Sequence, residues 1–218
     1  METFDRELLA AIGKSRPRVA IVPAAPTRRS EETLRRWAEL GRQHFEALGA
    51  EVETVLVRSR AEADDPASAQ AVGEADLIYV SGGRPHDLLA VLAGSQTWEA
   101  ARRAHQRGAT LAGCAAGAMV LGGRCLDMRR RLGWPVRWEL ALDVIPGAAV
   151  TPWYDGLPEP LRAFVILQAP RDTVVLGIDR ETAVVGRDGA WQVRGSGRVT
   201  VWRGRRRTRH RAGDVIRL

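Results

Sequence analysis

The sequence has 218 residues, of which 45% are hydrophobic and 27% are charged, values that are ordinary for a folded globular domain. Its length favours one domain over residues 1–218 with a substantial buried core. No apolar run reaches the ~18 residues that cross a bilayer, and the N-terminus lacks a signal-peptide core. We therefore expect a cytoplasmic protein that makes no membrane contact.

Cysteines and histidines are few and scattered. The two cysteines, Cys114 and Cys125, match neither a metal-ligand spacing nor a disulfide framework. The four histidines lie far apart in the sequence. We therefore expect no metal and no cofactor.

The formal net charge is +7, and nearly all of the positive charge is arginine because Lys14 is the only lysine. Arginines are dense at residues 129–131 and 203–211. Such clusters reflect either a GC-rich coding bias or a surface for nucleic acid or another polyanion. No aromatic residues interleave with them as in a stacking platform, and no DNA-binding motif accompanies them. We therefore favour coding bias, expect these arginines to lie in loops, and treat nucleic acid as an unlikely partner.

The N-terminal half predicts strands that alternate with helices. Ser30 is a candidate N-cap for the first of these helices, and Gly49 ends it. Alternation of this kind implies a parallel sheet with helices on both faces. The predicted strands are 19–22, 52–57, 76–80 and 109–112, and the predicted helices are 34–48, 87–92 and 97–107.

After about Val174 the pattern changes to short strands separated by glycine, aspartate and arginine. Asp188-Gly189 is a strong hairpin signal. The tail therefore predicts antiparallel strands that extend one edge of the sheet, at 174–178, 182–185, 191–193, 199–202 and 215–216. The expected fold class is α/β, with a mostly parallel sheet sandwiched by helices and an antiparallel C-terminal extension.

The most informative stretch is residues 111–120, Leu-Ala-Gly-Cys-Ala-Ala-Gly-Ala-Met-Val. The spacing Gly113-x-Ala115-x-Gly117 is that of a nucleophile elbow, G-x-S-x-G, with alanine at the nucleophile position. An elbow needs small neighbours because its strained turn brings backbone close to backbone. Alanine has no heteroatom that could attack a carbonyl. The sequence therefore predicts the frame of a hydrolase site without its reactive atom.

A second loop, Ser81-Gly82-Gly83-Arg84, follows the third predicted strand. Ligands of α/β sheets bind beyond the carboxyl ends of the strands, where this loop and the elbow both lie. The backbone N–H groups of Gly82 or Gly83, together with that of Ala116, could hold a developing oxyanion. Alone, a Gly-Gly pair is an ordinary strand-to-helix turn; together with the elbow, it favours a site.

These segments resemble the cyanophycinase and dipeptidase E family of serine peptidases. The elbow, G-C-A-A-G-A-M-V-L-G-G, is similar to that family's G-x-S-A-G-A-x-x-L-G. Loop 79–89 is similar to G-G-N-x-x-x-L-L, segment 177–185 to G-I-D-E-x-T-A-L-V, and segment 193–197 to V-x-G-x-G. The matches occur in order between Val19 and about Val201. The resemblance implies a flavodoxin-type sandwich like that of the class I glutamine amidotransferases.

The resemblance also implies roles for particular positions. The family's nucleophilic serine falls on Ala115, and its oxyanion amides fall on Gly82 or Gly83 and on Ala116. Its base histidine lies in a P-H-F/Y-D segment, which here reads Pro152-Trp153-Tyr154-Asp155. Trp153 therefore stands where the histidine belongs, and an indole nitrogen donates but cannot accept a proton.

Several further positions are candidate members of the expected site or its alternatives. Arg84 replaces the asparagine of the G-G-N loop, and either Asp127 or Asp155 could be the acidic third residue. Cys114 could be a thiol nucleophile, but it lies one position too early in the elbow and more often such a residue is a small buried hydrophobe. His86 could be a substitute base, although a lone loop histidine is more often a surface residue.

We therefore expect a non-catalytic homologue of a serine peptidase that binds a peptide, an amino-acid derivative or a protein partner through the degenerate cleft, with a homodimer left open. The alternative is a serine-type peptidase of acidic peptides such as aspartyl dipeptides or cyanophycin, either active or inactivated by an engineered Ser→Ala replacement at Ala115. Such a replacement would explain Ala115 but not Trp153. A third reading is an arginine-rich nucleic-acid binder.

Overall fold

The computed structural model describes residues 2–24, 31–128, 135–156 and 158–218. The chain divides into two compact units, Glu2–Gly117 and Ala118–Leu218. The prediction of one domain over residues 1–218 stays a prediction. Within the described residues, none of the helices has both the length and the apolar character needed to span a membrane.

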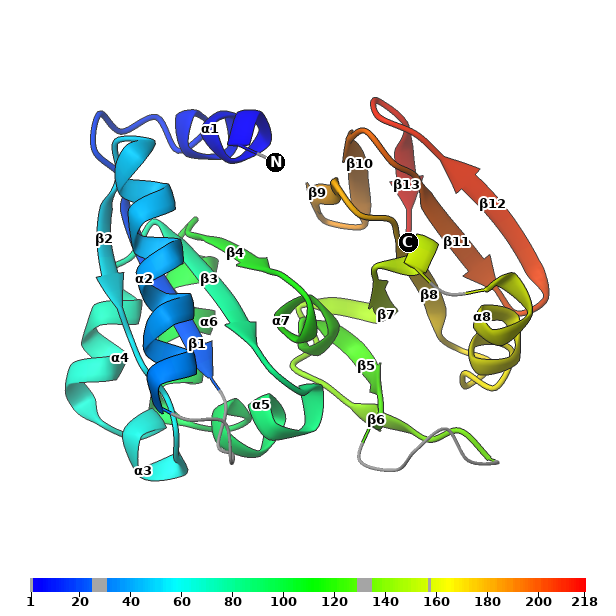
Figure 1. The fold of residues 1–218 in the computed structure, drawn as a ribbon, viewed down its shortest axis with the longest axis horizontal. Coiled ribbons are helices and arrows are strands. Elements are labelled where there is room, and N and C mark those ends of the chain that lie inside the picture. The colour runs from blue at the N-terminus through cyan, green and yellow to red at the C-terminus, as the bar shows by residue number, and fades with distance from the viewer. Residues whose placement is uncertain (1, 25–30, 129–134, 157) are drawn as a thin grey trace. The chain divides into compact units, whose positions relative to one another are not determined.

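The N-terminal unit contains a four-stranded parallel sheet in the order β2-β1-β3-β4 (Figure 1). Its strands are β1 (Arg18–Ala24), β2 (Glu51–Thr54), β3 (Leu77–Gly82) and β4 (Thr110–Gly113). Helix α1 (Glu2–Ala10) precedes β1, and the helices that connect the strands are α2 (Glu31–Ala47), α3 (Arg60–Ala63), α4 (Pro66–Gly73), α5 (Pro85–Leu92) and α6 (Gln96–Gln106). A short helix, α7 (Ala116–Val120), follows β4.

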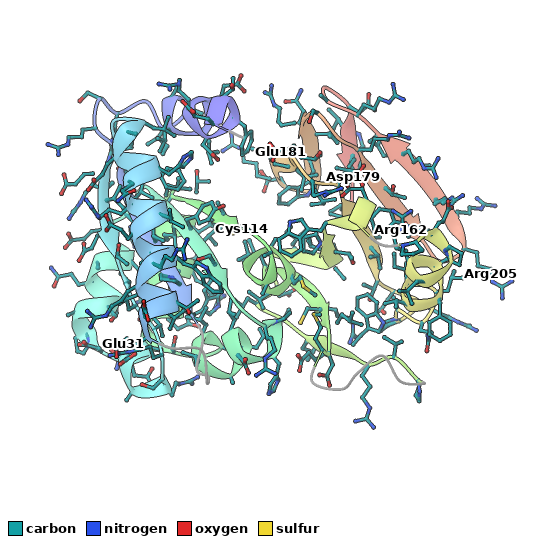
Figure 2. The ribbon with its side chains drawn as sticks, in the orientation of Figure 1. Glu31, Cys114, Arg162, Asp179, Glu181 and Arg205 are labelled. Atoms are coloured by element: carbon teal, nitrogen blue, oxygen red, sulfur yellow. The ribbon has the colours of Figure 1, made fainter. Side chains whose placement is uncertain are left out.

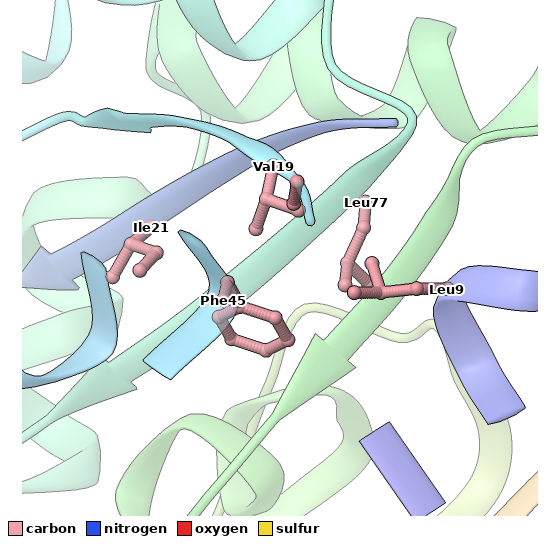
Figure 3. Close-up of a cluster of buried hydrophobic side chains, with 6 residues drawn as sticks. Leu9, Val19, Ile21, Phe45 and Leu77 are labelled. Atoms are coloured by element: carbon pink, nitrogen blue, oxygen red, sulfur yellow. The ribbon is translucent and has the colours of Figure 1, made fainter. Parts of the chain in front are cut away.

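The core of this unit follows from the two-residue period of β1. Val19 and Ile21 pack with Leu9 of α1, Phe45 of α2 and Leu77 of β3 in one apolar cluster (Figure 3). The residues that alternate with them, Ala20 and Val22, are also buried. Both faces of the sheet are therefore covered, as expected for parallel strands joined by helices.

The C-terminal unit contains two sheets of a different kind. A six-stranded mixed sheet has the order β12-β11-β8-β7-β5-β6, and a three-stranded antiparallel sheet has the order β13-β10-β9. The strands are β5 (Gly122–Leu126), β6 (Trp138–Leu140), β7 (Ile145–Pro152), β8 (Val174–Ile178), β9 (Thr182–Arg187), β10 (Ala190–Gly195), β11 (Val199–Arg203), β12 (Arg206–His210) and β13 (Val215–Arg217). A 3-10 turn, η1 (Tyr154–Gly156), and helix α8 (Glu159–Ile166) lie between β7 and β8.

The predicted fold class is confirmed: a parallel sheet flanked by helices is followed by a C-terminal part with antiparallel strands. The expectation that the whole tail extends one sheet edge was wrong, because β9, β10 and β13 pair with one another in a separate sheet and β8 pairs parallel with β7. The hairpin at Asp188-Gly189 is also confirmed, because both residues have positive φ (51° and 77°) between β9 and β10. Gly49, with φ of 92°, follows the end of α2 as predicted.

Three sequence expectations need comment. The strand predicted at 52–57 ends at Thr54, and Val57 forms only an isolated parallel bridge with Ala24. The placement of Arg203–Arg211 in loops was wrong, because residues 206–210 form strand β12. The candidate cap Ser30 and the arginines at 129–131 lie outside the described residues.

Candidate active site

The turn between β4 and α7 has the backbone geometry of an elbow. Ala115 has φ of 49°, in the left-handed region that costs an L-residue roughly 1–2 kcal/mol. The turn is fixed by two hydrogen bonds, from the N–H of Cys114 to the carbonyl of Val80 (3.2 Å) and from the N–H of Gly117 to the carbonyl of Cys114 (2.8 Å). A strained conformation of this kind persists where the surrounding structure determines it.

Gly117 brings the elbow against the end of β3. A Cβ at this position would lie 2.0 Å from the carbonyl oxygen of Val80 and 3.2 Å from the Cα of Ser81. No side chain fits into that space, because the opposing atoms are backbone. The small residue predicted at this position is therefore required by packing, and it places the elbow beside the Gly-Gly loop.

The two glycines of that loop differ in their surroundings. A Cβ at Gly82 would lie 2.2 Å from the carbonyl oxygen of Ala24 and 2.6 Å from the side chain of Leu88. Gly83 has open space, with nothing within 4 Å of such a Cβ. Packing therefore explains Gly82, whereas Gly83 leaves its backbone accessible to a ligand.

Trp153 lies in a second strained turn, in the C-terminal unit. It follows the end of β7, has φ of 51°, and its side chain is 64% exposed. The next residue, Tyr154, is buried, and its ring fills the space beside Gly177, where a Cβ would lie 2.3 Å from the ring. The guanidinium of Arg162 stacks 4.3 Å from the ring centroid, and Arg162 Nη1 donates to the carbonyl of Tyr154 at 2.5 Å.

Asp155, the residue after Tyr154, anchors the same turn through Arg180. Its carboxylate accepts hydrogen bonds from the backbone N–H of Arg180 (3.0 Å) and from Arg180 Nε (2.9 Å). These two bonds hold the pKa of Asp155 below its ordinary value. The backbone that follows Trp153 is therefore anchored at both Tyr154 and Asp155, independently of the indole.

Comparison with known proteins identifies the family of the chain. Residues 1–193 match peptidase family S51. The chain belongs to peptidase family S51. This result confirms the resemblance to dipeptidase E. No curated protein matches the chain significantly.

Two solved structures extend the family assignment to the fold. A peptidase from an acI-B1 Actinobacterium is 32% identical, with a TM-score of 0.87, over 100% of this chain and 91% of that chain. A candidate peptidase E protein from Listeria monocytogenes EGD-e is 17% identical, with a TM-score of 0.58, over 95% of this chain and 93% of that chain. At that identity the second structure supports the fold alone.

Cys114 of this S51 chain is poorly suited to act as a nucleophile. Its side chain lies on the N-terminal unit, at the end of β4 (Figure 2), and hydrogen-bonds with Tyr79. Burial raises the pKa of the Cys114 thiol, and the nearby Asp5 carboxylate raises it further. Asp5 is itself paired with His44 Nε2 at 3.0 Å. The hydrogen bond with Tyr79 lowers the pKa but does not offset burial, and because the thiolate is the reactive form, this environment disfavours Cys114 as a nucleophile.

The remaining residues of the Gly-Gly loop lie around the start of α5. Arg84 is exposed and its Nε donates to Asp87 at 2.9 Å. His86 is partly buried in the first turn of the helix and has an interaction partner of its own. One guanidinium nitrogen of Arg84 therefore binds a residue of its own helix, while much of the side chain is exposed to solvent.

The predicted site residues fall into two groups. Ala115, Ala116, Gly82, Gly83 and Cys114 lie at neighbouring strand ends of the N-terminal sheet, whereas Trp153, Asp155 and Asp127 belong to the C-terminal unit. Sequence reasoning missed the residues that anchor the Trp153 turn, namely Arg162, Gly177, Arg180 and Trp202. The Gly-Ile-Asp segment that contains Gly177 was the signal that could have located one of them. Among the described residues, no group of three acidic, cysteine or histidine side chains could hold a metal ion.

Proposed function

We propose that this S51 chain does not hydrolyse peptides and instead binds a peptide, an amino-acid derivative or a protein partner at the elbow. The observation that carries the proposal is Ala115, whose methyl group occupies the apex of a left-handed elbow turn. Acyl transfer by a serine peptidase requires an ester between the substrate and a hydroxyl at this position. A methyl group cannot form that ester.

The base position supports the same conclusion. Trp153 has no nitrogen that accepts a proton, and its side chain is largely exposed. Loss of triad members lowers turnover by about 10⁴–10⁶-fold in serine peptidases. With both positions substituted, we expect no measurable hydrolysis above background.

The backbone geometry of the elbow and the Gly-Gly loop is present without a nucleophile, which favours ligand binding at this site. The contacts of Gly117 with Val80 and the open flank of Gly83 depend on backbone and not on a nucleophile. Backbone N–H groups at these strand ends can hydrogen-bond a carbonyl or carboxylate whether or not a reaction follows. A substrate-like molecule is therefore the ligand class that fits the elbow.

An active serine-type peptidase of acidic peptides is the second candidate, and membership of family S51 favours it. It would require a nucleophile other than the residue at the elbow apex. Cys114 is the nearest nucleophilic group in the sequence, and its raised pKa disfavours that role. We therefore rank this candidate below the binding function.

Hydrolysis assays with aspartyl dipeptides, cyanophycin and ester substrates test the proposal. We expect no turnover by the purified chain and no change in the Cys114→Ala variant. Turnover that is robust in the purified chain and lost in Cys114→Ala would overturn the proposal and assign Cys114 as the nucleophile. Turnover that survives in Cys114→Ala would also overturn it, and active-site labelling with a fluorophosphonate would then locate the serine.

Binding is tested separately, by screening dipeptides and amino-acid derivatives by NMR. Gly83→Ala should weaken binding, because its new methyl group occupies open space beside the loop backbone without a steric clash in the fold. Gly73→Ala in α4 is the matched control, since its Cβ would make only an ordinary 3.8 Å contact. Equal loss of binding in both variants would contradict a site at the loop.

A further inference from the structure

The excess positive charge of the chain comes from one segment. Residues 174–218 contain 11 arginines and 4 acidic residues, while the whole chain has 33 basic and 26 acidic residues. The first 173 residues therefore contain 22 of each (33 less 11, and 26 less 4) and are balanced. A coding bias explains the choice of arginine over lysine, but it does not explain why acidic residues are so few in this segment.

Several arginines of the N-terminal unit are compensated locally. On α2, Arg35 pairs with Glu31 at 2.5 Å and Arg42 pairs with Glu39 and Glu46 at 2.6 Å. Such pairs at helical spacing neutralise the surface they cover. In the C-terminal segment Arg180 pairs with Asp155 and Arg207 pairs with Glu159, but the segment has 11 arginines for only 4 acidic residues of its own.

Several of these arginines lie at an exposed sheet edge. Strand β12 is the last strand of the six-stranded sheet and, within the described residues, pairs only with β11. Arg206 to Arg209 are all exposed. Arg205 lies in the turn that joins β11 to β12 and extends from it into solvent (Figure 2). The free edge of β12 offers backbone N–H and C=O groups for pairing with another strand.

The arginines of β12 alternate between the two faces of the sheet. Arg207 lies opposite Trp202 in the register, and its guanidinium is 5.5 Å from the indole centroid. Arg207 pairs with Glu159 of α8, and Arg209 Nη2 lies 3.9 Å from the same carboxylate. Two guanidinium groups on this face therefore share one acidic side chain.

The opposite face of β12 carries Arg206. Arg206 follows the turn in register with Arg203, and neither Arg205 nor Arg206 forms an ion pair with any residue in the described ranges. Both faces of this one strand therefore present guanidinium groups with spare hydrogen-bonding capacity.

We propose that β12 is a docking edge for an extended acidic peptide of a partner protein, which adds to the sheet as a further strand. An added strand would hydrogen-bond the free backbone edge. Its side chains would alternate between the two faces, as those of β12 do, so glutamates and aspartates on either face would meet arginines. Glu159 already illustrates how a carboxylate sits against one face.

A nucleic acid fits this edge less well. Single strands bind on exposed aromatic platforms within a basic groove, but Trp202, the aromatic beside these arginines, is only 5% exposed. Guanidinium groups divided between two faces also form no single groove for a phosphate backbone. The proposal is independent of ligand binding at the elbow, because all of its residues belong to β11, β12 and α8.

The test measures binding of a labelled peptide of alternating glutamate and threonine to the full chain. Three probes are compared: this peptide, the same peptide with prolines at alternate threonines, and a single-stranded oligonucleotide of equal charge. Proline removes the backbone N–H needed for strand pairing while leaving the charge unchanged. We expect the first peptide to bind and the other two probes to bind at least about tenfold more weakly.

Two double variants with the same change in net charge show whether peptide affinity depends on the β12 edge or on the overall charge of the chain. Arg206→Glu with Arg209→Glu should lower the affinity for the acidic peptide at least about tenfold. Arg36→Glu with Arg103→Glu changes the net charge equally at two exposed helix positions and should change the affinity less than about twofold. Hydrogen exchange on the unmodified chain, which does not depend on the folding of any variant, should show new protection at residues 206–210 when the peptide is added.

Several outcomes would overturn the proposal. They are no peptide binding by the unmodified chain, equal losses in both double variants, or protection that leaves residues 206–210 unchanged. Equal binding of the proline peptide would exclude strand addition. Tighter binding of the oligonucleotide than of the acidic peptide would assign the edge to nucleic acid.

Discussion

The indole Nε1 of Trp202 donates a hydrogen bond of 2.8 Å to the hydroxyl of Tyr154, and both side chains are buried. This bond joins the turn after β7 to strand β11. Together with the Asp155–Arg180 contacts, it fixes the backbone on the C-terminal side of Trp153. The conformation at position 153 therefore depends on its neighbours and should survive replacement of the tryptophan.

Restoring the apex hydroxyl alone should not create a peptidase. Ala115→Ser supplies a nucleophile without a base, so its reaction with a fluorophosphonate should stay slow. Adding Trp153→His supplies an imidazole at the position that the family resemblance gives to the base, where the positive φ suits histidine better than most residues, and labelling should become faster. The control is Ala115→Ser with Trp153→Phe. If Ala115→Ser alone reacts as fast as an ordinary serine hydrolase, another residue acts as base, and His86 is the first to test.

Tyr154→Phe should lower the free energy of unfolding by about 1–3 kcal/mol, because it leaves the buried Nε1 of Trp202 without its acceptor. Denaturant unfolding of the variant measures this loss. Trp202→Phe and the double variant complete a mutant cycle, which isolates the bond from the packing of each ring. A coupling energy near zero would show that the hydrogen bond contributes nothing to stability.

Gly117→Ala and Gly83→Ala form a matched pair that tests the elbow packing. Gly117→Ala should cost several kcal/mol, on the order of 2–4, because its Cβ would collide with the backbone of Val80. Gly83→Ala should change stability by less than about 1 kcal/mol, because nothing lies near its Cβ. Chemical denaturation gives both values. Equal stabilities of the two variants would contradict the close approach of the elbow to β3.

Much of this site could be predicted from sequence because its signals are local. The spacing of Gly113, Ala115 and Gly117 predicts an elbow, and Asp188-Gly189 predicts a hairpin, from a few adjacent residues. The anchors of Trp153 could not be predicted in this way, since Trp202 lies 48 positions from Tyr154. Only the folded sheet brings them together.

Strand β12 shows a different limit. Its sequence, Arg-Arg-Thr-Arg-His, has almost none of the β-branched and apolar residues that identify strands. It forms because the turn at Gly204, with φ of 58°, returns the chain alongside β11. The amino-acid composition of residues 206–210 favours a loop, but backbone pairing with the buried strand β11 makes them a strand.

Cys114 should resist alkylation in the native chain. Burial and the Asp5 carboxylate raise the pKa of its thiol, so little thiolate exists at neutral pH. Burial also raises the pKa of Cys125, to about 12. Iodoacetamide followed by mass spectrometry should therefore modify both cysteines slowly at pH 7 and rapidly after unfolding. Rapid and selective modification of native Cys114 would restore it as a candidate nucleophile.

The Asp155–Arg180 contacts should make stability depend on pH in the acidic range. Hydrogen bonds from the backbone N–H and the guanidinium of Arg180 lower the pKa of Asp155 in the folded chain. Its contribution is therefore complete above the unfolded value of about 3.9 and is lost as the pH falls through the lower folded value. Asp155→Asn should reduce the unfolding free energy at pH 7 and should converge with the unmodified chain in strong acid. Asp172→Asn, at a side chain that is 75% exposed, is the control and should leave stability nearly unchanged at both pH values. A deficit of Asp155→Asn that is the same at pH 7 and in strong acid would show that the carboxylate charge has no part in holding the turn.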